Sequence, residues 1–202
     1  MTSFNDEIIY TVGHSSHAID KFIALLKTYE IRVVIDVRSS PYSRYCPQFN
    51  QDALTSALKK SDIDYVYLGN ELGARPDNAC CYENGRVSFL KIIKSDPFNN
   101  GIHKVLCEMQ NHKIVLLCSE KDPINCHRTI IISHFLSRYG VHIQHILENG
   151  AIEEHYETEK RLLKTMKIER SLFEQDATEE SLIEEAYSKQ AKNIFYPSGD
   201  ST

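Results

Sequence analysis

Short apolar runs alternate with longer amphipathic stretches along most of this chain, and this alternation constrains the fold more than any other feature. Five apolar runs have the length and composition of β-strands, at residues 8–12, 32–37, 65–69, 113–118 and 141–147. Helical patterns lie between them, at residues 18–30, 50–61, 87–95, 98–111 and 123–140. Strands joined by crossover helices predict an α/β fold, with a mostly parallel sheet of about five strands and helices on both faces.

Two charged segments with narrow apolar stripes follow the last predicted strand. We expect residues 1–150 to form the α/β domain and residues 151–202 to form a C-terminal helical appendage packed on the same domain. The acidic start of the chain resembles no secretory signal, and no apolar run is long enough to span a bilayer. The sequence therefore predicts a cytoplasmic protein without a membrane partner, and its six cysteines are expected to be reduced thiols.

The charge of the chain is unevenly distributed. Residues 1–146 contain 16 Lys and Arg against 15 Asp and Glu, whereas residues 147–202 contain 7 against 13. Binding to an extended nucleic-acid duplex requires a basic face, which this composition does not provide. Any contact with a polyanion is therefore expected to be local, and the acidic C-terminal helices are a candidate surface for a protein partner.

Polar residues follow three of the predicted strands at the point where each strand ends. They are His14 and Ser15, Asp36 and Arg38, and Cys118 and Glu120. In open parallel sheets, ligands bind in the crevice beyond the carboxyl ends of the strands. The sequence therefore predicts a site at this edge, although the loops that follow strands are polar in many proteins without one.

Asp36 closes the apolar run VVID, and Arg38 lies on the same side of an extended chain two residues later. A carboxylate at this boundary suits acid–base chemistry, and it suits a structural ion pair with Arg38 about equally well. The next segment, residues 39–50, places Arg44 among three aromatic residues. Such a mixture is typical of base stacking with a phosphate held alongside, and also of a proline-stiffened loop whose aromatics pack on the domain.

The stretch LLCSEKDPINCHR brings two thiols, an imidazole and a guanidinium close to a predicted helix start. A metal could be bound by Cys118, Cys126 and His127, with His14 as a fourth ligand, but the close-spaced ligand pairs of zinc motifs are lacking. Alternatively, either thiol could act as a nucleophile activated by the helix dipole and His127. A third interpretation is core packing, with Cys126 as a small apolar residue and His127 as a satisfied buried histidine.

An anion site fits the same residues best. Arg128 and the free amides of a helix start would bind a phosphate, while Glu120 serves as acid or base.

Several segments resemble the bacterial and archaeal family known as domain of unknown function 488. They are TVGHSS, DVRSSPYSRYCPQFN, YVYLGNELGARP, LLCSEKDPINCHR and LIEEAYSKQAKNIFYP, in this order along nearly the whole chain. The resemblance implies a compact α/β domain with a site drawn from these segments. It implies no particular reaction.

The leading hypothesis is an enzyme that acts on a nucleotide or a nucleic-acid end. Phosphate and substrate would be bound by Ser15, Arg38, Arg44, Cys118 and Arg128. Asp36 and Glu120 would share the acid and base roles that glycosidic-bond cleavage needs, with His14 and His127 as proton carriers. No cofactor is predicted.

Two other hypotheses remain open. One is a non-catalytic module that binds a phosphorylated ligand or nucleic acid and signals through its C-terminal helices. The other is a metal-dependent site that uses Cys118, Cys126 and His127.

Overall fold

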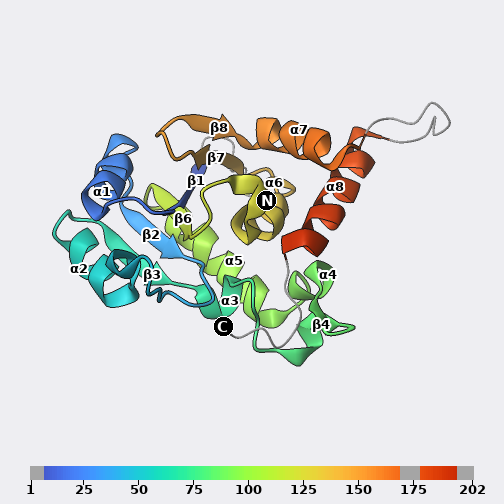
Figure 1. Ribbon diagram of the computed structural model, residues 1–202, viewed down its shortest axis with the longest axis horizontal. Coiled ribbons are helices and arrows are strands. Elements are labelled where there is room, and N and C mark those ends of the chain that lie inside the picture. The colour runs from blue at the N-terminus through green and yellow to red at the C-terminus, as the bar shows by residue number, and fades with distance from the viewer. Residues whose placement is uncertain (1–6, 169–177, 195–202) are drawn as a thin grey trace.

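The structure is a computed structural model that describes residues 7–168 and 178–194. Its centre is a six-stranded sheet in the order β3-β2-β6-β1-β7-β8 (Figure 1). The strands are β1 (Ile8–Gly13), β2 (Val33–Asp36), β3 (Asp64–Tyr67), β6 (Ile114–Cys118), β7 (His142–Ile146) and β8 (Ile152–Glu154). All pair in parallel except β8, which runs antiparallel to β7. The α/β fold with a mostly parallel sheet is therefore confirmed, with one edge strand more than predicted.

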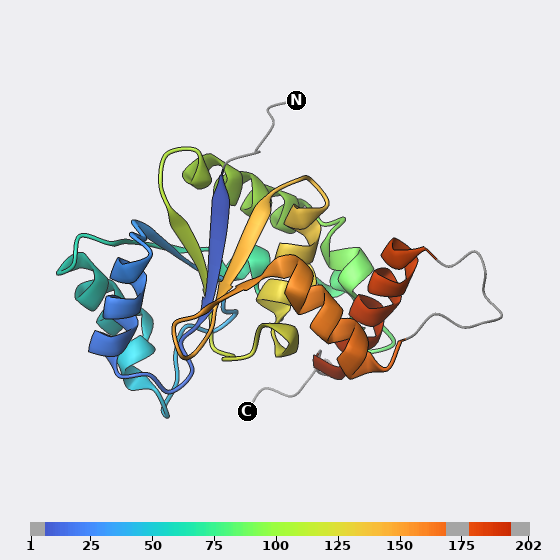
Figure 2. The same cartoon turned by 90° about the horizontal axis from the view of Figure 1, so that it is seen from above.

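Helices cover both faces of this sheet (Figure 2). On one face lie α1 (Ile19–Thr28) and α2 (Gln51–Lys59), and on the other lie α5 (Asp96–Met109) and α6 (His134–Ser137). Shorter helical elements are η1 (Pro47–Phe49), α3 (Gly69–Leu72), η2 (Ala79–Cys81) and α4 (Phe89–Ile92). Side chains of β6 alternate between the two cores, with Val115 and Leu117 in one and Leu116 in the other. The central strand is apolar throughout because both of its faces are buried.

The two predicted C-terminal helices are α7 (His155–Met166) and α8 (Glu179–Ile194), which lie side by side in both views (Figures 1 and 2). Their apolar stripes join the core on the α5 side of the sheet through Leu162, Ala186, Tyr187 and Ala191. The end of the family-like segment LIEEAYSKQAKNIFYP lies beyond the described residues. In the part of the chain that the structure describes, no helix is long and apolar enough to cross a bilayer.

The prediction of a single helix at residues 123–140 is wrong. The segment forms the 3-10 turn η3 (Pro123–Asn125), the π-helix η4 (Arg128–Ser133) and the short helix α6. Between the first two, Cys126 has extended backbone angles, with φ −130° and ψ 139°. Asp122 does cap the first turn by accepting a bond from the amide of Ile124, and Gly140 ends the segment with a positive φ of 78°.

A small hairpin lies between α3 and α4. Its strands are β4 (Tyr82–Glu83) and β5 (Arg86–Val87), joined by Asn84 and Gly85. Both linking residues have positive φ, as the tight turns of hairpins require. Strands of two residues are too short to leave an alternating pattern in the sequence.

Candidate functional site

The connections that follow the neighbouring strands β2 and β6 lead in opposite directions. From β2 the chain continues through α2 to β3, whereas from β6 it continues through η4 and α6 to β7, toward the opposite edge. Adjacent strands whose connections diverge in this way mark the position where α/β sheets bind ligands. The predicted convergence is present, since Asp36 pairs with Leu117, and Gly13 pairs with Cys118 on the other side of β6.

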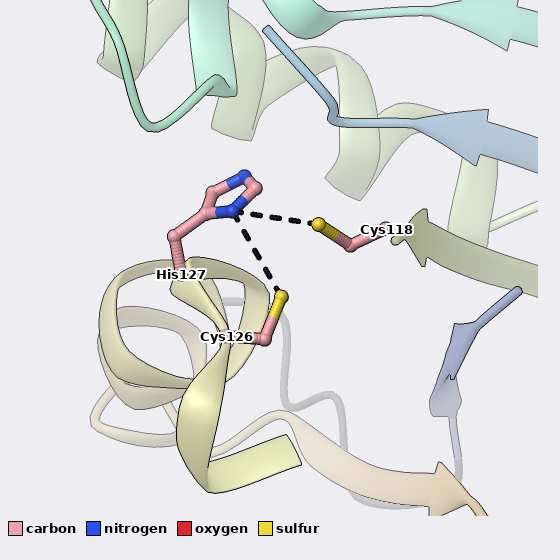
Figure 3. Close-up of side chains that lie close together, drawn as sticks. All are labelled: Cys118, Cys126 and His127. Atoms are coloured by element: carbon pink, nitrogen blue, oxygen red, sulfur yellow. Dashed lines mark hydrogen bonds between the residues drawn. The ribbon is translucent and has the colours of Figure 1, made fainter. Parts of the chain in front are cut away.

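Three side chains that could bind a metal ion lie close together near the end of β6 (Figure 3). Cys118 is the last residue of β6, and Cys126 and His127 link η3 to η4. The Nδ1 atom of His127 lies 3.5 Å from the sulfur of Cys118 and 3.9 Å from the sulfur of Cys126. All three ligand atoms lie within 4.8 Å of one another, and all three residues are buried.

These separations suit a tetrahedral metal ion. With Zn–S near 2.3 Å and Zn–N near 2.0–2.1 Å, tetrahedral angles place ligand nitrogen and sulfur roughly 3.6 Å apart. Both nitrogen–sulfur distances around His127 lie within a few tenths of an ångström of this value. The three side chains could therefore bind such an ion with only small movements.

The imidazole of His127 is oriented by the neighbouring strand. Its Nε2 lies 2.9 Å from the carbonyl oxygen of Val37, the residue after β2. A carbonyl can only accept, so Nε2 carries the proton, and in the neutral ring Nδ1 presents its lone pair to the two sulfurs. Metal-binding histidines commonly donate their second ring nitrogen to a carbonyl in this manner.

Arg128 holds the backbone between the two cysteines. Its guanidinium, which is fully buried, donates 2.6 Å to the carbonyl of Glu120 and 3.3 Å to the hydroxyl of Thr11. The carbonyl of Glu120 also lies against Gly13, where an added Cβ would be only 1.8 Å from it. The loop after β6 can therefore approach β1 only because residue 13 has no side chain.

The two thiols have opposite tendencies to ionise. Burial alone would raise the pKa of Cys126, but the hydrogen bond from Cys118 and the charge of Arg128 lower it well below its usual value. The pKa of Cys118 is raised well above its usual value, because it donates that bond and is buried.

The predicted pair Asp36 and Arg38 forms a buried ion pair. Both oxygens of Asp36 accept bonds from the Arg38 guanidinium, and one accepts a further bond of 2.8 Å from Tyr65. The remaining donors of Arg38 reach the carbonyl of Phe49 and Nε2 of His14. Burial works against the charge of Arg38, but the hydrogen bond to Asp36 and the negative charge of Asp36 together outweigh it and raise the Arg38 pKa.

His14 is buried beside this ion pair. Its ring stacks on Phe49 at 4.3 Å, and its Nδ1 donates to the carbonyl of Ser15. Nε2 is thus left to accept from Arg38. Burial lowers the pKa of His14 to about 4, so the ring is neutral near pH 7. His14, Asp36 and Arg38 are therefore hydrogen-bonded to one another as one buried group.

The other predicted site residues face solvent. Glu120 is exposed, and partial burial of its carboxyl raises its pKa. Ser15 is half-buried and has a positive φ of 47°, while its amide donates to the carbonyl of Ser119. Arg44 is exposed on the loop after β2. Arg128, by contrast, is enclosed by protein carbonyl and hydroxyl groups rather than open to a phosphate.

The aromatic residues around Arg44 fall into two groups. Phe49 is fully buried in the core, whereas Tyr42 is 56% exposed and Tyr45 is 96% exposed. Internal bonds from the amides of Tyr45 and Cys46 to the hydroxyl of Ser43 hold the loop in shape. The structure therefore displays two tyrosines and an arginine on an ordered loop.

Sequence reasoning missed the carbonyl of Val37, which fixes the tautomer of His127. No side-chain pattern marks a backbone acceptor. The only available signal was position, because Val37 directly follows the second predicted strand.

Comparison with protein-family models gives a match. The model of the family described as Domain of unknown function DUF488 matches residues 18–135, which is more than half of the chain. This range contains the three candidate metal ligands but excludes β1, α7 and α8. Neither the curated proteins nor the solved structures gave a match.

Proposed function

This chain belongs to the DUF488 family of domains of unknown function, and we propose from its own side chains that it is a metal-dependent enzyme whose metal is bound by Cys118, Cys126 and His127. The observation that carries this proposal is the oriented lone pair of His127. Its Nδ1 is directed at two sulfurs, while its Nε2 proton is donated to Val37. A histidine that merely filled the core would not need two thiols around its free nitrogen.

The number of ligands favours a catalytic over a structural zinc ion. Structural zinc sites are closed by four protein ligands, whereas catalytic sites have three and leave one position for water or substrate. Within residues 7–168 and 178–194, the cluster contains three candidate ligands. Two thiolates and an imidazole form a donor set that zinc accepts, and a bound zinc ion makes water a nucleophile near neutral pH.

The exposed carboxyl of Glu120 is two residues from Cys118, on the loop that Arg128 holds against β1. In this proposal it serves as the acid or base that exchanges protons with substrate at the edge of the site. Asp36 and Arg38 hold His14 and the loop after β2 in place. Glycosidic-bond cleavage by Asp36 with Glu120 stays a prediction, which the burial of Asp36 does not favour.

Cobalt substitution tests the metal site. Protein purified without a histidine tag is stripped and titrated with Co²⁺, which gives thiolate-to-metal charge-transfer absorption when bound by cysteine. We expect this absorption in the wild type and its loss in Cys118→Ser and in Cys126→Ser. Cys107→Ser is the matched control, since Cys107 is exposed on α5. An unchanged spectrum in both buried-cysteine variants would exclude this ligand set.

A nucleotide or nucleic-acid end is the substrate that the surroundings favour. Tyr42 and Tyr45 are exposed on either side of Arg44, on a loop tied to the end of β1 by a contact between Cys46 and the carbonyl of Ser15. Aromatic faces stack on bases in a sequence-tolerant way, and arginine binds phosphate. The same loop would suit the non-catalytic binding module, in which case no turnover accompanies binding.

Substitution on this loop tests the nucleotide proposal. Short fluorescent single strands and mononucleotides are titrated into the wild type, Tyr45→Ala and Arg44→Ala. Each stacked base is worth about 1–3 kcal/mol, so Tyr45→Ala should weaken binding at least several-fold. Tyr139→Ala is the control, because Tyr139 is also well exposed but follows α6. Equal loss in the control, or none in Tyr45→Ala, would refute recognition by this loop.

A further inference from the structure

The C-terminal helix α8 lies against the turn that carries two of the proposed metal ligands. Gln190 is buried on this helix, and its amide nitrogen donates 2.8 Å to the carbonyl of Ile124 and 3.0 Å to the side-chain oxygen of Asn125. These two residues directly precede Cys126. The side chain of Gln190 therefore holds the turn that directly precedes Cys126.

Helix α7 holds the beginning of the same turn. The guanidinium of Arg161 donates to both oxygens of Asp122, at 2.8 and 3.1 Å, and also to Glu153. Asp122 in turn accepts the amide of Ile124. Both ends of η3 are thus fixed by residues outside the range that the family model matches.

A buried chain of hydrogen bonds reaches the other side of the ligands. Its members are, in order, Arg128, Thr11, His145, His155, Tyr187 and Glu159. One direction satisfies every member: Arg128 donates to Thr11, each group donates to the next, and Tyr187 ends the chain on a carboxylate. Arg128, which directly follows His127, is therefore connected to α8 by hydrogen bonds that pass through β1 and β7.

From these contacts we propose that Gln190 is a positioning residue for the metal ligands and that α8 completes the metal site. The inference rests on the proposed metal site. The hydrogen bonds of Gln190 are made with Ile124, Asn125 and Asn193, so it acts through η3, which sets where Cys126 and His127 lie relative to Cys118. The Oε1 atom of Gln190 accepts from Asn193, so the amide is oriented to donate toward the turn.

The physical consequence is loss of preorganisation. Without the amide of Gln190, the carbonyl of Ile124 loses this buried donor, and the turn can settle in other positions. Outer contacts of this kind typically change metal affinity 10–100-fold. We therefore expect the same change in the dissociation constant for zinc, in a protein that stays folded.

The test is zinc affinity measured against a competing chelator for the full chain. Gln190→Met keeps the size of the side chain and removes its donor, and it should weaken zinc binding by about 10–100-fold. The cobalt-substituted variant should also show shifted d–d bands, which report ligand geometry. Asn193→Ala is a milder second variant at an exposed position, with a smaller shift expected in the same direction.

Ala186→Gly is the matched control, because it loosens α8 by roughly 1 kcal/mol at a buried position that does not contact η3 through a hydrogen bond. It should leave the zinc constant and cobalt spectrum unchanged. Wild-type affinity and spectrum in Gln190→Met and Asn193→Ala would overturn the positioning role alone. A wild type that binds no zinc would instead overturn the proposed metal site.

Discussion

Acid should destabilise this protein through His155, which lies in the buried hydrogen-bonded chain below α8. Burial, with a smaller effect from the charge of His134, lowers the pKa of His155 from 6.5 to about 3. The groups that face it are His145 on β7, Tyr187 on α8, Glu159 on its own helix and His134 on α6. Its imidazole is therefore neutral in the folded protein across the whole mildly acidic range.

The sign and size of the effect follow from linkage. Below pH 6.5 the unfolded chain binds a proton at His155 that the folded chain does not, so stability falls as pH decreases toward 3. At about pH 5 the solution is roughly 1.5 pH units below the pKa of an unfolded histidine. Protonation of His155 in the unfolded state therefore lowers the free energy of unfolding by about 2 kcal/mol between about pH 8 and about pH 5.

Urea unfolding of wild type and His155→Gln at these two pH values measures this contribution. The variant is less stable throughout, but its loss on acidification should be smaller than that of the wild type by about 2 kcal/mol. His112→Gln is the control, since the side chain of His112 is 46% exposed, and it should lose as much as the wild type. An acid-induced loss in His155→Gln equal to that of the wild type would refute the reasoning.

Two further substitutions probe the strand ends. Asp36→Asn leaves the buried guanidinium of Arg38 without its carboxylate and should cost about 3–5 kcal/mol in a urea unfolding experiment, and a cost below 1 kcal/mol would contradict a buried ion pair. Gly13→Ala places a Cβ against the carbonyl of Glu120, so thermal unfolding should show a clear loss of stability and cobalt titration a weaker charge-transfer band, whereas a wild-type melting curve would contradict the close approach.

The sequence predicts the sheet because its signal is local. Each parallel strand is an apolar run buried on both faces, as in VVID and IVLLC, and this requires no knowledge of distant residues. The pairing of Asp36 with Arg38 is local as well, because two residues in an extended segment share a side. Strand β8 escaped prediction since its three residues, Ile152–Glu154, form no apolar run.

The candidate metal site is harder to recognise from the sequence, because its geometry depends on how the loop after β6 folds back. Cys118 precedes Cys126 by eight residues, a spacing that matches no zinc motif, and only the return of the loop toward β6 brings them together. The regular helix expected from Pro123 does not form, since Cys126 is extended and η4 is a π-helix. π-Helical turns are rare and often lie at functional sites.

The contacts of the arginines also depend on groups that the sequence does not reveal. The sequence predicts Arg38 and Arg128 as phosphate ligands. In the structure their guanidinium groups donate hydrogen bonds to Asp36, to backbone carbonyls and to Thr11. Acceptors on the backbone cannot be seen in a pattern of side chains. Arg44, in the exposed loop, is the member of the predicted set whose position still suits a phosphate.

The metal content of tag-free protein, measured by mass spectrometry immediately after purification in zinc-supplemented medium, tests the central proposal most directly. We expect about one zinc ion per chain for the wild type and far less for Cys126→Ser, with Cys107→Ser unchanged. A wild type that contains no zinc and acquires none on addition of the metal alone would contradict the proposal.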